Sequence, residues 1–203
     1  MPHQDINQIT IASYNKYIDE YIRKDSQDTD RREAYWPGVE NFLKLLDPNT
    51  EIFEIGSAMG RHASVMEEAG FRVQRSDASK SFVEYLNKHG HTAKQYDVLS
   101  TELSEQYRAI YAHAVLLHFP LLEFRKALRT VHKSLKPKGL FCFSMKLGDF
   151  EGWREKGLSG RRYFRYWNVE DLTKELQSAG FNILNTFVTA DSSFVFMTAQ
   201  KSQ

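Results

Sequence analysis

The sequence predicts one α/β domain built around a mostly parallel β-sheet. Two observations carry this prediction. Short apolar stretches of strand length alternate with amphipathic stretches of helical length, and several of the helical stretches end at a glycine. A chain of 203 residues is long enough for one such core and short for two. Because strand–helix–strand connections form right-handed crossovers, we expect a three-layer sandwich with helices on both faces of the sheet.

The expected elements follow one another in a regular order. Two helices, 11–23 and 32–46, precede the sheet. Strands are expected at residues 51–55, 71–75, 93–96, 109–115 and 140–145, and helices at 61–69, 79–88 and 121–135. Gly70 and Gly90 lie where left-handed helix C-caps are common, and the turn at 136–139 separates the last helix from the fifth strand.

The C-terminal part departs from this alternation. A helix at 169–179 leads into two further strands, 182–188 and 194–200. The five residues between these strands are too few for a crossover helix, so the strands should pair antiparallel as a hairpin. The whole sheet is then a seven-stranded, Rossmann-like one, parallel except at its C-terminal edge.

Composition excludes several classes of protein. The net charge of +1 lacks the basic excess typical of nucleic-acid binders, so nucleic acid is an unlikely partner. The lone Cys142 allows neither an intrachain disulfide nor a zinc site built from cysteine pairs, and we expect no metal. The chain has no apolar run of membrane-spanning length, and its polar start does not resemble a secretory signal. We therefore expect a cytoplasmic protein without a membrane partner.

The first strand ends in an unusual glycine turn. Residues 54–60 read E-I-G-S-A-M-G, which is G-x-x-x-G and not the G-x-G-x-x-G of dinucleotide-binding turns. Glycines here let the backbone approach a nucleotide-like ligand closely. The acid Glu54 would repel a pyrophosphate, whereas it suits a ligand with a positively charged amino or sulfonium group.

Two further acids follow the next two strands. Asp77 ends the second strand, at the position from which a carboxylate accepts hydrogen bonds from the two hydroxyl groups of a ribose. Asp97 ends the third strand, within reach of an adenine edge. Together with Glu54 they should face one crevice at the carboxyl ends of the strands. Open α/β sheets bind their ligands in such a crevice.

Several stretches resemble class I S-adenosylmethionine-dependent methyltransferases, and in particular a small bacterial subgroup of them. The glycine turn, Asp77 and Asp97 look like the cofactor motifs of that family. Further similarities are A-H-A-V-L-L-H at 112–118 to an "SLLH" segment, K-P-K-G at 136–139 to "LKPGG", S-M-K-L-G at 144–148 to "S-x-K-x-G", G-R-R-Y-F at 160–164 to "GRYF", and S-Y-N-K-Y at 13–17 to an N-terminal "SYN…Y" helix. The resemblance covers residues 11–200.

The resemblance implies S-adenosylmethionine as cofactor and assigns residues to it. Glu54 would hold the methionine end, Asp77 the ribose and Asp97 the adenine. The expected cofactor-binding set is Tyr14, Tyr17, Glu54, Gly56, Ser57, Gly60, Asp77, Ala78, Asp97 and Val98. Ala58 departs from the family, which has a glycine there, and Lys138 departs from the usual proline-glycine signal.

The resemblance also divides the single domain, 1–203, into functional parts. Residues 1–48 would form a helical lid, 49–147 the cofactor-binding core, 148–168 a substrate loop, and 169–203 the C-terminal helix and hairpin.

Two histidines follow the fourth strand, beside the expected methyl group. Histidine titrates near neutral pH, so His118 or His113 could take a proton from an acceptor hydroxyl or amine. The alternative is that each histidine only holds local structure through hydrogen bonds.

The segment from Asp149 to Trp167 is rich in arginine and aromatic residues. We expect it to build the acceptor pocket, because loops at the carboxyl ends of strands usually do so. The candidates are Lys146, Arg161, Arg162, Tyr163 and Tyr166. Arginine forks and aromatic rings favour a small anionic or aromatic acceptor; the alternative is a solvated basic loop packed on the sheet edge.

The function predicted is methyl transfer to an oxygen or nitrogen atom of a small molecule, by a monomer or homodimer. Three alternatives remain. An RNA-modifying methyltransferase could stack an unstacked base on the aromatic residues of the 149–167 segment. A non-catalytic S-adenosylmethionine-binding protein is the second alternative, and the alanine at position 58 of the glycine turn is the feature that favours it. A nicotinamide-dependent oxidoreductase is the third, but it would need the glycine spacing G-x-G-x-x-G.

Overall fold

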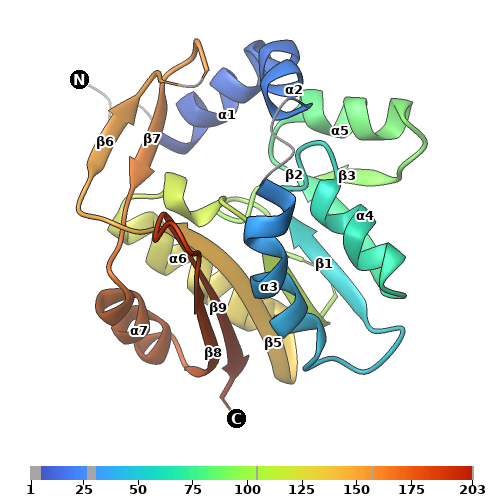
Figure 1. Ribbon diagram of the computed structural model, residues 1–203, viewed down its shortest axis with the longest axis vertical. Coiled ribbons are helices and arrows are strands. Elements are labelled where there is room, and N and C mark those ends of the chain that lie inside the picture. Colours follow the sequence, from blue (N-terminus) through green and yellow to red (C-terminus); the bar gives the residue numbers. More distant parts are fainter. Residues whose placement is uncertain (1–5, 27–30, 104, 157, 203) are drawn as a thin grey trace.

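A seven-stranded sheet forms the centre of the computed structural model, which describes residues 6–26, 31–103, 105–156 and 158–202. The strands lie in the order β3-β2-β1-β4-β5-β9-β8 (Figure 1). Their bounds are β1 Glu51–Ile55, β2 Arg72–Asp77, β3 Ala93–Gln95, β4 Tyr107–Ala112, β5 Leu135–Lys146, β8 Phe181–Val188 and β9 Phe194–Lys201. The first five strands run parallel, and β9 pairs antiparallel with both β5 and β8. The predicted fold class is confirmed.

The order of strands reverses direction between β1 and β4. The chain leaves β1 toward β2 and β3 on one side, and later continues through β4 and β5 on the other. Loops that leave neighbouring strands in opposite directions open a crevice at this point. A ligand site is therefore expected at the carboxyl ends of β1 and β4.

Helices cover the sheet. Their bounds are α3 Arg31–Leu43, α4 Arg61–Glu68, α5 Lys80–Lys88, α6 Leu121–Ser134 and α7 Val169–Ser178. In Figure 1, α3 crosses the near side of the sheet, where it contacts β8 and β9, and α6 lies behind β5. The strand β5 is buried over residues 140–145 because both of its faces are covered, which explains the continuous apolar run there.

The N-terminal helices differ from the prediction. The expected single helix is two, α1 (Ile6–Lys16) and α2 (Ile18–Ser26), separated at Tyr17. Both lie above the carboxyl ends of the strands, beside α5, whereas α3 packs on a face of the sheet (Figure 1). Of the described residues before β1, those of α1 and α2 lie above the carboxyl ends of the strands, where a lid is expected.

The segment after β5 was expected to be a loop and is partly a hairpin. Its strands β6 (Glu151–Arg154) and β7 (Arg162–Arg165) pair antiparallel, and β7 contacts α1. Burial does not separate aromatic from charged side chains along these strands, because Arg162, Tyr163 and Phe164 are buried whereas Trp153 is exposed. The turn at residues 136–139 also differs, because it lies inside β5 as an irregularity in the pairing with β4.

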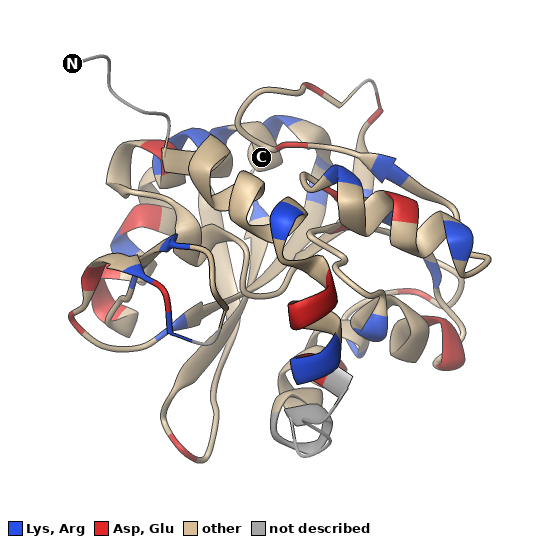
Figure 2. Ribbon diagram, turned by 90° about the horizontal axis from the view of Figure 1, so that it is seen from above, with Lys and Arg blue, Asp and Glu red and all other residues tan. Residues whose placement is uncertain are grey.

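Charged residues of both signs are interspersed along the same helices and strands (Figure 2). Within the described part of the chain, no helix combines the length and the apolar character needed to cross a membrane.

Candidate functional site

A cavity of about 710 Å³ lies at the carboxyl ends of β1, β2 and β4, beneath α1 and α2. Its volume is within the range of small-molecule sites, about 300–1,000 Å³. The glycine turn after β1 forms its floor, the loops after β2, β3 and β4 form its sides, and residues of α3 and α4 line one end.

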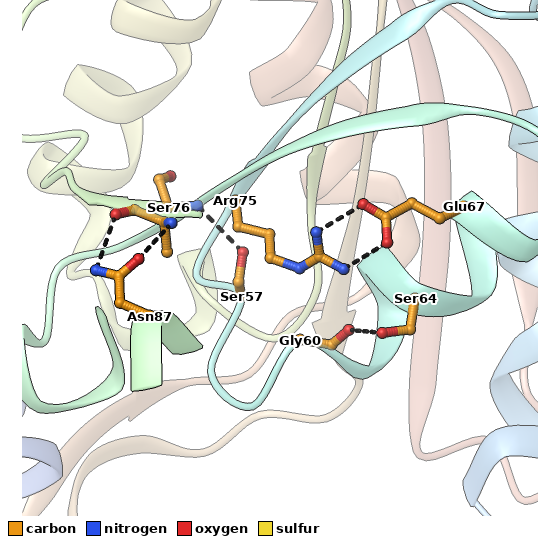
Figure 3. A network of polar contacts seen from close by, with 8 residues as sticks. Ser57, Gly60, Ser64, Glu67, Arg75, Ser76 and Asn87 are labelled. Atoms are coloured by element: carbon orange, nitrogen blue, oxygen red, sulfur yellow. Dashed lines mark hydrogen bonds and ion pairs between the residues drawn. The ribbon is translucent and has the colours of Figure 1, made fainter. Parts of the chain in front are cut away.

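The glycine turn is held tightly against β2. The amides of Gly56 and Ser57 both donate to the Ser76 carbonyl, and the Ser57 hydroxyl accepts from the Ser76 amide (Figure 3). Gly56 has φ +75°, and a Cβ on it would lie 2.3 Å from Cγ2 of Val115. Only glycine combines this backbone conformation with so close an approach.

Ala58 also has a left-handed backbone, with φ +46°. This conformation costs an L-residue about 1–2 kcal/mol, so glycine would adopt it at lower cost. The Ala58 amide donates to the Asp77 carboxylate at 2.9 Å, which holds the turn in place.

Arg75 supports the turn from behind. Its guanidinium makes two hydrogen bonds, 2.6 and 2.7 Å, to the Glu67 carboxylate on α4 (Figure 3). It also packs under Gly60, because a Cβ on Gly60 would lie 3.3 Å from Nε of Arg75. The start of α4 is thus fixed beside the cavity.

Glu54 presents a buried carboxyl group to the cavity. It is 2% exposed, and its Oε2 has no hydrogen-bond partner among the residues that the structure describes. Burial raises the pKa of Glu54 to about 7, against the opposing effect of a hydrogen bond with Ser57. A buried carboxyl oxygen without a partner is costly, so it indicates a ligand that donates to it.

The other two acids line the same cavity with their oxygens already engaged. Asp77 accepts from the amides of Ala58 and Ser79, and burial raises its pKa to about 6. Asp97 accepts from the Asn7 side chain on α1 at 2.9 Å and from the Leu99 amide. Asp77 therefore shapes the glycine turn in addition to facing the ligand space.

His118 is held by hydrogen bonds at both ring nitrogens. Its Nδ1 lies 2.7 Å from the Tyr163 carbonyl, which can only accept, so Nδ1 carries the proton. Nε2 then accepts from the Tyr14 hydroxyl at 2.9 Å. Burial lowers the pKa of His118 to about 3, so the ring is neutral at physiological pH. This arrangement favours a positioning role over that of a proton acceptor.

His113 also lines the cavity, but its hydrogen-bond partner and its ring contacts differ from those of His118. Its Nδ1 lies 2.8 Å from the Ser144 hydroxyl, which also accepts from the Ala114 amide. Its ring stacks on that of His62, with centroids 4.3 Å apart. Burial lowers the pKa of His62 to about 4, and its Nδ1 is bonded to the Tyr111 hydroxyl.

The residues predicted from the sequence separate into two groups. Those that line the cavity are Tyr14, Glu54, Gly56, Ser57, Asp77, Ala78, Asp97, Val98, His113 and His118. The others, all within the described ranges, lie outside its lining: Tyr17, Gly60, Lys146, Arg161, Arg162, Tyr163 and Tyr166. Tyr17 packs against Gly160.

The arginines of the β6–β7 hairpin are engaged within the protein. Arg154 stacks over Phe150 at 3.9 Å, and Arg161 over Trp153 at 4.7 Å. Arg162, 8% exposed, donates to the Lys156 carbonyl and lies 3.4 Å from the Tyr14 hydroxyl. It therefore contacts Tyr14, which lines the cavity, without being part of the lining itself.

The cavity also contains residues that the sequence did not single out. They include Tyr35, Trp36, His62, Phe82 and Phe194. The aromatic residues of α3 follow the helical period of a packed face and give no separate signal of a ligand. Within the described residues, no three histidine, cysteine, aspartate or glutamate side chains gather as a metal site.

Comparisons with known proteins agree with this fold. A family model described as "Methyltransferase domain" matches residues 28–186. The structure of the DhpI–SAH complex is similar with a TM-score of 0.80 and 18% identity, covering 97% of each chain. The Burkholderia thailandensis 1,6-didemethyltoxoflavin-N1-methyltransferase, with its substrate and S-adenosylhomocysteine bound, has a TM-score of 0.71 and 19% identity, covering 100% of this chain and 93% of that one. The glycopeptide N-methyltransferase MtfA has a TM-score of 0.67 and 14% identity, covering 83% and 90%. No curated protein sequence matches significantly.

Proposed function

Because the chain belongs to the methyltransferase-domain family, we propose that it transfers a methyl group from S-adenosylmethionine to a nitrogen or oxygen atom of a small-molecule acceptor. The neighbours in fold bind S-adenosylmethionine or S-adenosylhomocysteine, and two of them are N-methyltransferases. The observation that carries the proposal for this chain is Glu54, with its buried carboxyl oxygen that lacks a partner among the described residues.

The residues of the cavity fit S-adenosylmethionine. Glu54 would accept from the ammonium group of the methionine end, which would supply the missing partner and favour the carboxylate form. Asp77 would face the ribose and Asp97 the adenine. The aromatic side chains of Tyr14 and Phe82, which lie together with ring centroids 6.1 Å apart, would cover the ligand from the side of α1 and α5.

The bound cofactor supplies a methyl group on a positively charged sulfur, ready for in-line displacement. The protein then has to orient the acceptor and exclude water. The α1 helix contributes from above, since its Asn7 is bonded to Asp97 and its Tyr14 to His118 at the edge of the cavity. A proton leaving an acceptor N–H or O–H group would go to His113, whose ring is oriented by Ser144.

Calorimetric titration of the purified protein with S-adenosylhomocysteine tests the cofactor, with NAD as the control. We expect micromolar affinity for S-adenosylhomocysteine and none for NAD, because Glu54 opposes a pyrophosphate. Absence of binding by either compound would overturn the proposal. Incubation with methyl-labelled S-adenosylmethionine and candidate acceptors, followed by mass spectrometry, tests the transfer itself.

A further inference from the structure

One end of the cavity is built mainly of rings. Tyr35 on α3, His62 on α4, His113 after β4 and Phe194 on β9 are joined here by ring contacts, and Trp36, next to Tyr35 on α3, lines the same cavity. The three acids assigned to the cofactor lie on other elements, at the ends of β1, β2 and β3. The cavity therefore has a polar, acidic part and an aromatic part, which we call the ring wall: Tyr35, Trp36, His62, His113 and Phe194.

The rings of this wall are ordered against one another. The planes of His62 and His113 are 21° apart, and those of His113 and Phe194 are 25° apart with centroids separated by 5.8 Å. Tyr35 lies against both His113 and Phe194, at 5.0 and 5.2 Å. Rings fixed in this way offer flat faces and edges to a ligand at little cost in side-chain entropy.

The ring wall carries little charge of its own, and the nearest lysine, Lys146, lies outside the cavity lining with its Nζ 5.5 Å from the centroid of the Phe194 ring and 5.4 Å from that of Tyr166. Burial keeps His62 neutral at physiological pH, because it lowers the pKa of that ring to about 4. Among the cavity-lining side chains that the structure describes, Arg61 is the only arginine or lysine, and it forms an ion pair with Asp25 at 2.9 Å. An anionic acceptor would meet five acids in this lining, Asp25, Glu54, Glu68, Asp77 and Asp97, against that single base.

We propose that the methyl acceptor is an uncharged, flat heteroaromatic molecule that binds against the ring wall. This inference rests on the proposed methyl transfer and narrows its substrate class. Stacking and edge contacts with Tyr35, Trp36 and Phe194 select a flat ring, and the excess of acids over bases in the cavity lining disfavours a negative charge. The arginines of the β6–β7 hairpin, which suggested an anionic acceptor, stack on aromatic side chains of the protein.

Three bicyclic probes of similar size test the proposal on protein saturated with S-adenosylhomocysteine. Quinoline is flat and uncharged, quinaldate is the same ring with a carboxylate, and decahydroquinoline is saturated and cationic. We expect quinoline to bind at least tenfold more tightly than either of the other two in calorimetric titration. Tighter binding of quinaldate or of decahydroquinoline would overturn the proposal, as would equal binding of all three.

Matched variants locate the binding. Trp36→Leu and, as a second substitution in the same wall, Phe194→Leu should each weaken quinoline binding at least tenfold. The control is Trp153→Leu, since Trp153 lies on β6 outside the cavity lining and is 36% exposed. Unchanged quinoline affinity in both wall variants would refute the assignment.

The same titrations separate this inference from the proposed function. S-adenosylhomocysteine affinity should stay within about twofold in the wall variants, because Glu54, Asp77 and Asp97 are unaltered. Failure of the wild-type protein to bind S-adenosylhomocysteine would overturn the proposed function, whatever quinoline does. Normal S-adenosylhomocysteine binding without a preference for quinoline would overturn only the aromatic acceptor.

Discussion

Replacing Glu54 with glutamine tests the unusual carboxyl group on which the site depends. Glutamine has nearly the same shape as glutamic acid and does not titrate. In the wild-type protein, burial raises the pKa of Glu54 from 4.5 to about 7. A carboxyl group with a higher pKa in the folded state binds more protons there than in the unfolded chain. The ligand-free protein therefore loses stability as the pH rises from about 4.5 through 7.

The size of this effect follows from the shift in pKa. At about 1.4 kcal/mol per unit, the whole shift is worth about 3 kcal/mol, and about 2.5 kcal/mol of it falls between pH 5 and pH 8. Asp77, with a pKa raised to about 6, adds a loss at lower pH. Because Asp77 titrates in both proteins, the difference between wild type and Glu54→Gln isolates the contribution of Glu54.

Urea unfolding at pH 5 and pH 8, without ligand, measures this difference. We expect the wild-type free energy of unfolding to fall by about 2.5 kcal/mol more than that of Glu54→Gln. The exposed Glu102 provides the control, and Glu102→Gln should follow the wild type. Parallel pH dependence of the wild type and Glu54→Gln would refute the assignment of the raised pKa to Glu54.

Ligand affinity should change in the opposite direction. The ammonium group of S-adenosylhomocysteine needs the carboxylate form of Glu54, which is about one hundredth of the molecules at pH 5 and about nine tenths at pH 8. The wild-type Kd should therefore fall by up to about a hundredfold between these pH values. Glu54→Gln should bind at least tenfold more weakly at pH 8 and should lose most of this pH dependence, which calorimetry would detect.

Three further substitutions test the turn and the roof of the cavity. Gly56→Ala should lower the free energy of unfolding by about 3 kcal/mol and abolish S-adenosylhomocysteine binding, because the new Cβ meets Val115. Adding Val115→Ala should restore part of this stability; if it restores none, the clash with Val115 is not the cause. Ala58→Gly should raise the free energy of unfolding in urea by about 0.5 kcal/mol, because glycine removes the cost of the left-handed backbone and this gain exceeds the entropy that glycine adds to the unfolded chain. A lower free energy of unfolding would contradict this prediction. Tyr14→Phe should lower the free energy of unfolding by about 1–2 kcal/mol, because it leaves the buried Nε2 of His118 without a hydrogen-bond donor. An unchanged midpoint of urea unfolding would show that this hydrogen bond is not made.

The sheet and the acidic part of the cavity could be predicted because their signals are local. Strand periodicity fixes which residues end each parallel strand, and parallel strands bring those ends to one edge. Glu54, Asp77 and Asp97 therefore meet at the cavity although they are far apart in the sequence. The same reasoning identified Gly56, whose φ of +75° is a property of the turn itself.

The internal contacts of the arginine-rich segment could not be predicted in this way. Its composition fits a solvent-exposed basic surface as well as a hairpin whose arginines stack on its own aromatic rings, because arginine beside aromatic residues is typical of both. In the structure, Arg154 lies over Phe150 and Arg161 over Trp153, within and beside the paired strands β6 and β7. Pairing of this kind is set by tertiary contacts, and the short strands have no clear alternation of their own.

The contacts of α1 explain why the hairpin still matters to the cavity. The Ser13 hydroxyl donates to the Arg161 carbonyl, 148 residues away, and the Thr10 hydroxyl accepts from the Tyr163 amide. On the other side of the helix, Asn15 accepts from Ser79 at the start of α5. The helix is thus fixed between the hairpin and α5, and Tyr14 is held over the cavity by both attachments. Substitutions in the hairpin should therefore act on ligand binding through the position of α1.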